Sequence, residues 1–302
     1  MNQLQRSIKI DPEDLQSANL HDETYIEIQD GWVTLRELIS ATQNFSPDKE
    51  IGRGCFGVTY KAELQDFQVV AVKKLKFRPE LNLNMTRNEI ESLKLLNHEN
   101  VVQLLDFYSS PNLTFLVYEY ISGGSLNEAL HGHSNFMLNW KTRFEICLGI
   151  AKGLMYLNSK SVVHDNIKSS DILLTETLVP KISNQFMLSG CKDSEHVQKN
   201  DTVEKKDVYS YGILLLEIVS GKEVTQYQEN DNSVFLLDKA LDLHAKEKLA
   251  DLVDGRLPNY DEQQASSILN LAIICTNLLP SLRPAMHEIV MVLEAEKTID
   301  QI

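Results

Sequence analysis

Residues 51–58 have the sequence Ile-Gly-Arg-Gly-Cys-Phe-Gly-Val, between two segments with strand patterns. The stretch carries the glycines of a G-x-G-x-x-G-x-V loop, which we assign to Gly52, Gly54 and Gly57, with Val58 as its valine. Glycine at such positions lets backbone N–H groups approach a triphosphate with no Cβ in the way. The loop alone is weak support for a nucleotide site, because a glycine-rich hairpin that binds nothing can have the same sequence.

The following strand and helix strengthen the nucleotide hypothesis. Val70-Ala71-Val72-Lys73 places a lysine where it can pair the α- and β-phosphates, with Ala71 beside the nucleotide. Glu89 lies on the next predicted helix, at the place of an acidic partner for that lysine. Three matching elements in the correct order make coincidence improbable.

The N-terminal part of the chain divides into two regions. Residues 1–30 are polar and acidic with little periodicity, which predicts a poorly ordered extension. Thr34 and Glu37 have the spacing of a capping box, and apolar residues follow at helical intervals. We therefore predict an amphipathic helix over residues 34–45.

The rest of the chain changes from a strand pattern to a helix pattern. Short β-branched runs between residues 51 and 75 predict an antiparallel hairpin. The further predictions are a helix over 85–96, strands over 101–108 and 113–119, and helices over 138–158, 206–220, 233–253 and 263–295. This order predicts an α+β chain with a β-rich lobe over 31–121 and a helical lobe over 122–302.

Composition excludes several classes of function. The net charge of −14 disfavours nucleic acid and anionic lipid as partners, because both require clustered Lys and Arg. The four cysteines form no close pair, so neither a disulfide framework nor a zinc site is indicated. No apolar run reaches the roughly 18 residues that span a bilayer. We expect a soluble chain in a reducing, intracellular compartment.

Over about residues 33–296 the chain resembles a protein kinase, of the plant receptor-like and receptor-like cytoplasmic type. The resemblance implies a two-lobed protein-kinase fold, with backbone contacts to adenine at Glu119 and Ile121 in the hinge. The segments that carry it, besides those above, are Leu35-Arg36-Glu37-Leu38, His98-Glu99-Asn100-Val101-Val102, Leu116-Val117-Tyr118-Glu119-Tyr120-Ile121, Ile150-Ala151-Lys152-Gly153-Leu154, Lys206-Asp207-Val208-Tyr209-Ser210-Tyr211-Gly212 and Leu282-Arg283-Pro284.

The catalytic loop departs from the family pattern H-R-D-x-K-x-x-N. The resemblance places Asn166 at the position of the catalytic base, where an amide cannot accept a proton at physiological pH. A positioned base is typically worth about 10²–10⁴ in rate. Asp165 replaces the arginine, and its use as a substitute base is an open alternative. Lys168 is kept, either to contact a γ-phosphate or only for local hydrogen bonds.

The expected metal ligands are also changed. Asn184-Gln185-Phe186 stands in place of Asp-Phe-Gly, so the carboxylate that normally holds Mg²⁺ is lost. Asp171 replaces the second ligand, an asparagine, and is the one carboxylate left to hold a cation weakly. We therefore expect Mg²⁺ binding to be weak or absent.

The activation segment is short, with about twenty residues between Asn184 and Asp207 and no Ala-Pro-Glu. This is too short for the family's usual substrate platform. Arg283 resembles the arginine that pairs with the missing glutamate, and it either pairs with another acid such as Glu204 or is solvated. Asp207 matches the residue that supports the catalytic-loop backbone.

These changes favour a pseudokinase, a kinase fold without efficient phosphotransfer that acts through docking or allostery. The alternatives are a weak or unconventional serine/threonine kinase using Lys73, Asp171 and Lys168, and a non-kinase binding module. ATP binding is expected, although the loop and lysine could persist only to hold the small lobe together. The expected partners are proteins, among them receptor kinases. We expect a cytoplasmic chain, which a partner or an upstream segment could hold at the inner face of the plasma membrane.

Overall fold

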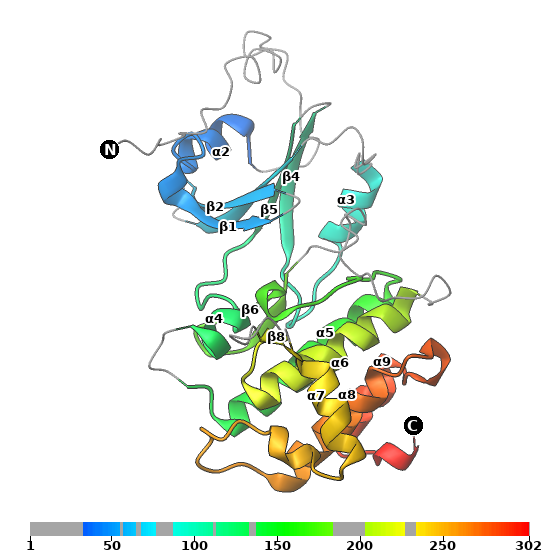
Figure 1. Ribbon diagram of the computed structural model, residues 1–302. Helices are drawn as coiled ribbons and strands as arrows, with labels where there is room; N and C mark the ends of the chain where they lie inside the picture. Colours follow the sequence, from blue (N-terminus) through cyan, green and yellow to red (C-terminus); the bar gives the residue numbers. More distant parts are fainter. Residues whose placement is uncertain are drawn as a thin grey trace.

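A computed structural model of the chain has a small, sheet-based lobe above a larger helical lobe (Figure 1). The predicted extension over 1–30, Asn184 and most of the predicted activation segment lie outside the described residues. Among the residues that are described, no helix is both long and apolar enough to cross a membrane. The structure describes residues 33–54, 57–64, 68–76, 87–110, 113–132, 137–183, 203–226 and 234–301.

The small lobe is built on a five-stranded antiparallel sheet with the strand order β1-β2-β3-β5-β4. The hairpin of β2 and β3 confirms the predicted pairing, with Tyr60 opposite Val72. The predicted strands over 101–108 and 113–119 also pair with each other. The first of them begins at Leu104 rather than Val101, because Val101 makes only an isolated bridge to Ile182. The strands are β1 (Glu50–Gly54), β2 (Gly57–Glu63), β3 (Val69–Leu75), β4 (Leu104–Ser110) and β5 (Leu113–Glu119).

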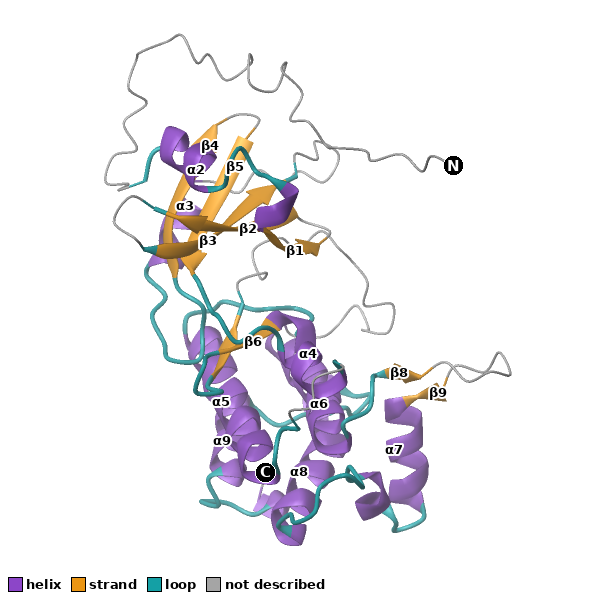
Figure 2. Ribbon diagram, turned by 90° about the vertical axis from the view of Figure 1, so that its left-hand side faces the viewer, coloured by secondary structure: helices purple, strands orange, loops and turns teal. Residues whose placement is uncertain are grey.

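Two helices, α2 (Leu35–Ala41) and α3 (Arg87–Lys94), cover opposite faces of this sheet (Figure 2). The two-residue period of β5 explains the division, since Phe115 packs in the α2 cluster and Leu116 in the α3 cluster. The capping box of Thr34 and Glu37 is confirmed. The helix ends at residue 41 rather than 45, because residues 43–45 all have positive φ angles.

The large lobe surrounds α5, which runs for 20 residues with Ile146, Ile150 and Leu154 fully buried. Two small sheets accompany the helices, β6 (Ile172–Leu174) with β7 (Pro180–Ile182) and β8 (Thr225–Gln226) with β9 (Val234–Phe235). The helices are α4 (Leu126–His131), α5 (Trp140–Ser159), α6 (Val203–Ser220), α7 (Leu236–Ala245), α8 (Glu262–Cys275) and α9 (Met286–Leu293).

Two of the predicted helices are wrong in extent. The segment 233–253 begins in β9, and α7 ends before Glu247, whose positive φ breaks the helix. The segment 263–295 is two helices joined by a turn that contains Pro280 and Pro284, and proline cannot continue the hydrogen-bond ladder of a helix. Apolar periodicity alone does not register such interruptions.

Candidate functional site

One face of the hairpin carries the predicted nucleotide residues Ala71 and Lys73. Lys73 is only 8% exposed, although it is charged. Directly opposite residues of an antiparallel pair share a face, so Thr59, which pairs with Lys73, and Lys61, which pairs with Ala71, lie on this same face.

The assignment of Val58 to the site is wrong. Val58 pairs with Lys74 and belongs to the buried cluster beneath α2, on the face of the sheet opposite Lys73. The valine of the loop pattern falls two positions after its third glycine, where this chain has Thr59. Counting the spacing from Gly57 identifies Thr59, so the signal was present in the sequence.

The three glycines have different surroundings. Gly57 permits close packing of the hairpin, because a Cβ there would lie 2.1 Å from the Lys74 carbonyl oxygen. A Cβ at Gly54 would meet no heavy atom within 4 Å among the described residues, and one at Gly52 would meet only Thr59, at 4.0 Å. Among the described residues, packing therefore explains Gly57 and does not explain the other two glycines.

The predicted hinge residues lie at the end of β5 and just beyond it. Glu119 is the last residue of β5, and Ile121 is half-buried against the main core cluster. Glu89 lies on α3, where the structure describes its backbone but not its side chain. The predicted contact between Lys73 and Glu89 is therefore not tested.

Asp207 on α6 supports the backbone of the catalytic loop. Its two carboxylate oxygens accept hydrogen bonds from the N–H groups of His164, at 3.1 Å, and Asp165, at 2.9 Å. Burial raises the pKa of Asp207 to about 7, while these two hydrogen bonds act in the opposite direction. The architectural role predicted for Asp207 is confirmed.

The side chain of Asp165 points to α6. Its Oδ1 lies 2.7 Å from Lys206 Nζ, and its φ of 72° is a left-handed conformation that aspartate tolerates better than most residues. Asn166 beside it is half-buried, and Lys168 is exposed. In this arrangement the Asp165 carboxylate is engaged by a cation, which disfavours its use as a substitute base.

Asp171 is buried in the short 3-10 helix Ser169–Asp171. Burial raises the pKa of its carboxyl group, although the neighbouring His164 and Lys73 and the N–H of Lys168 favour the charged form. A raised pKa means that a proton competes better with a metal cation for this carboxylate. In the described ranges, no three His, Cys, Asp or Glu side chains gather as a metal site.

A buried hydrogen-bond network, which the sequence did not reveal, also holds the catalytic loop at Ser169. Glu217 of α6 accepts a hydrogen bond from Ser169 Oγ at 2.7 Å and lies 3.0 Å from His131 Nε2 of α4. Asn127 of α4 also donates to Ser169, at 3.3 Å. The loop between Lys168 and Asp171 is thus fixed to two helices, which only the tertiary contacts could show.

Arg283 is not solvated, so the expectation of a solvated guanidinium is wrong. It is 5% exposed, and its guanidinium donates to the carbonyl oxygens of Lys205 and Asn277, both at 2.9 Å. The guanidinium also lies over the ring of Tyr209, with the carbon 4.9 Å from the ring centre. Arg283 therefore fastens the α8–α9 connection to the start of α6.

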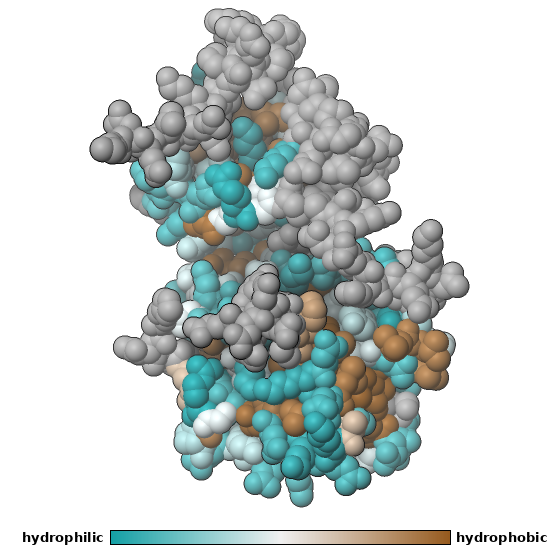
Figure 3. Space-filling model, viewed as in Figure 1, coloured by the Kyte–Doolittle hydropathy of each residue, from teal (hydrophilic) through white to brown (hydrophobic). Residues whose placement is uncertain are grey.

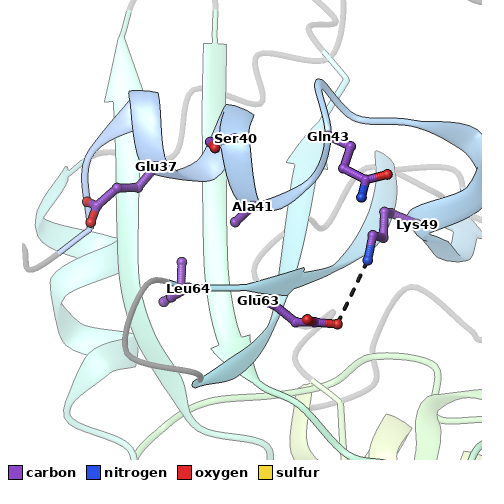
Figure 4. A pocket seen from close by; sticks show the side chains of 7 residues that line it. All are labelled: Glu37, Ser40, Ala41, Gln43, Lys49, Glu63 and Leu64. Carbon is purple, nitrogen blue, oxygen red and sulfur yellow. Dashed lines mark ion pairs between the residues drawn. The ribbon is translucent and has the colours of Figure 1, made fainter.

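A pocket of about 230 Å³ opens between α2 and β2, on the outer side of the small lobe (Figure 4). Its lining includes Glu37, Lys49 and Glu63, and Lys49 Nζ lies 3.8 Å from a carboxylate oxygen of Glu63. None of its lining residues belongs to the predicted nucleotide site. This pocket therefore gives no support to that site.

The chain is similar to curated plant proteins described as probable receptor-like kinases. The chain is 37% identical over 302 aligned positions to the probable LRR receptor-like serine/threonine-protein kinase At1g07650 of Arabidopsis thaliana, covering 92% of this chain and 30% of the relative. It is 35% identical to At1g56130, a probable kinase of the same description and organism, over 89% of this chain and 28% of that protein. The chain thus spans less than a third of the length of these relatives.

The profile of the family described as protein tyrosine and serine/threonine kinase matches residues 45–293. The match covers the strand hairpin, the hinge, the catalytic loop and the helices of the large lobe. Together with the five-stranded small lobe and the helical large lobe, it settles the resemblance: the chain belongs to the protein tyrosine and serine/threonine kinase family, with relatives among the plant LRR receptor-like kinases.

Proposed function

We propose that this chain is a receptor-like-kinase-type pseudokinase that binds ATP weakly and acts by docking partner proteins, without efficient phosphotransfer. The observation that carries the proposal is the chemistry of the catalytic loop. Asn166 stands at the base position, and the neighbouring carboxylate of Asp165 is paired with Lys206 at 2.7 Å. The loop therefore offers no free carboxylate beside the base position.

Retained ATP binding is supported by the small lobe. Lys73 and Ala71 share one face of the hairpin with Thr59, and packing against the described part of the chain explains neither Gly52 nor Gly54. The adenine contacts would be backbone hydrogen bonds at Glu119 and Ile121, which tolerate changes of side chain. Mg²⁺ would contribute little, because Asp171 is the one carboxylate kept at the expected ligand positions.

Docking is supported by apolar side chains that gather at the surface of the large lobe beside α9 (Figure 3). Leu278, Leu279 and Leu282 are 79%, 55% and 58% exposed, on the connection that Arg283 fastens to α6. Exposed apolar groups on a rigid support are typical of protein interaction surfaces. The partners would be receptor kinases or other signalling proteins at the inner face of the plasma membrane.

The second candidate is a weak or unconventional serine/threonine kinase. It is favoured by the two relatives named above, which are described as probable kinases, and by the retention of Lys73 and Lys168 and the carboxylate of Asp171. In this alternative Asp171 holds a single cation, and Lys168 contacts the γ-phosphate.

A thermal-shift titration with ATP distinguishes the two candidates. We expect a small stabilisation by ATP that is nearly the same without metal, with Mg²⁺ and with Mn²⁺, and that persists in Asp171→Asn. Lys73→Met should reduce it. A stabilisation that requires Mg²⁺ and is lost in Asp171→Asn would instead support the kinase, especially if the chain also transfers phosphate from labelled ATP to a generic substrate.

A further inference from the structure

An ion pair joins the hinge to the strand that precedes the altered metal-binding segment. Lys181 Nζ of β7 lies 2.8 Å from Glu119 Oε1 at the end of β5, and both side chains are largely shielded, with exposures of 16% and 29%. The same carboxylate oxygen accepts a hydrogen bond from the N–H of Gln103 at 2.9 Å. One carboxylate oxygen of β5 therefore contacts two other segments of the chain, at Gln103 and at Lys181.

The strand β7 is in turn held by its backbone. The N–H of Ile182 donates to the carbonyl of Asn100 at 2.9 Å, and the N–H of Val102 donates to the carbonyl of Ile182 at 2.8 Å. The next residue, Ser183, donates to the carbonyl of Asp171 at 2.8 Å. A continuous set of polar contacts thus connects the hinge to the carboxylate-bearing residue of the predicted metal site.

We propose that Lys181 is a positioning residue that, through Glu119, sets the backbone of the hinge and couples occupancy of the hinge by a nucleotide to the local stability of β7. The inference deepens the proposed function and rests on it. Coupling of this kind is reciprocal, so a nucleotide that stabilises the hinge stabilises β7, and a loosened β7 weakens nucleotide binding by the same factor.

The size of the effect follows from the partial burial of the pair. Partly exposed ion pairs contribute up to about 1 kcal/mol, which corresponds to about a two- to five-fold change in an equilibrium constant. Lys181→Met keeps the length of the side chain and removes the charge, so the freed Glu119 carboxylate should hold Gln103 less firmly. Lys181→Arg keeps the charge and should behave like the natural chain.

The test combines calorimetric ATP titration with hydrogen exchange of peptides that cover residues 101–105 and 180–183. In Lys181→Met we expect ATP to bind about two- to five-fold more weakly. The amide of Gln103 should exchange faster without ATP, and the protection that ATP gives to β7 should be lost. The control is Lys152→Met, which breaks a more exposed pair with Glu294, 2.7 Å apart between α5 and α9, and should change neither readout.

The outcomes separate this inference from the proposed function. Unchanged Gln103 exchange in Lys181→Met would overturn the hold of Lys181 on the hinge, whether or not ATP binds. Equal ATP affinities and equal protection of β7 in the two chains would overturn the coupling. If the natural chain binds no ATP while the Gln103 amide still responds to Lys181→Met, the nucleotide part of the proposed function is wrong and the positioning role is supported.

Discussion

Lys206 Nζ lies 2.7 Å from Asp165 Oδ1, so the residue at the family's catalytic-loop arginine position is bound to the first turns of α6. Asp165 carries a negative charge at a position of the loop where the family pattern has a positively charged arginine. Because Asp207, the next residue after Lys206, also holds the loop backbone, consecutive residues of α6 fix both a side chain and the main chain of the loop.

Breaking this pair should have a small effect on stability. Both side chains are about one-third exposed, so Lys206→Met should lower the free energy of unfolding by less than about 1 kcal/mol. Asp165→Arg should cost more, because it places a second cation beside Lys206. Urea denaturation measures both, with Lys246→Met in the exposed pair with Asp242 as the control. Equal stability of Asp165→Arg and the natural chain would show that the pair does not persist in solution.

Asp207→Asn should destabilise the chain and change its pH dependence. An amide can accept from only one of the two N–H groups with its oxygen, so the loss should be about 1–3 kcal/mol. The folded pKa of Asp207, about 7, lies above its ordinary value, so the folded chain binds the extra proton between about pH 4 and pH 7. Through this group, the free energy of unfolding should fall as pH rises across that window.

Urea denaturation at pH 5 and pH 7.5 checks the sign. The decrease attributed to Asp207 should be absent in Asp207→Asn. Asp254 should not contribute to this decrease. Burial raises its pKa, but hydrogen bonds from Arg256 and Arg143 outweigh burial and hold the pKa at about 2, below the window of pH 4 to pH 7. The same decrease with pH in the natural chain and in Asp207→Asn would mean that Asp207 is ionised throughout.

The two arginines that bind Asp254 should differ greatly in their effect on stability. Arg143 is 1% exposed, and it also donates to the carbonyls of Leu138 and Ile218, whereas the Arg256 side chain is 57% exposed. Arg143→Met leaves buried acceptors unpaired and should cost about 3–5 kcal/mol. Arg256→Met should cost about 1 kcal/mol or less. Similar losses in the two variants, measured by urea denaturation, would contradict this assignment.

Restoring two carboxylates should not restore phosphotransfer. The double change Asn166→Asp with Asn184→Asp puts carboxylates at the predicted base and metal-ligand positions, yet we expect the segment between residues 187 and 206 to be too short to present a peptide. Labelled ATP and a generic protein substrate measure the outcome, with the natural chain as the control. Robust phosphorylation by the double variant would show that the short segment does not prevent substrate binding, and would weaken the pseudokinase proposal.

The sequence by itself determined the family, the α+β class and the identity of the altered chemical groups. Strand hairpins follow from local alternation, and the prediction that Asn166 stands at the base position follows from the spacing of the catalytic-loop pattern. Helix ends were less predictable: residues 43–45 adopt positive φ angles that periodicity does not encode, and α2 therefore stops at Ala41. The spacing of the loop pattern points to Thr59, two positions after Gly57, rather than to Val58.

The tertiary structure alone decided which distant groups meet. The ion pair of Glu119 with Lys181, the pair of Asp165 with Lys206 and the burial of Arg283 over Tyr209 join residues that share no local pattern. Burial likewise raises the pKa of Asp171 and of Asp207, because removal from water disfavours a charged carboxylate. Residue type and spacing are local properties of the chain, whereas contact and desolvation arise only after the chain has folded.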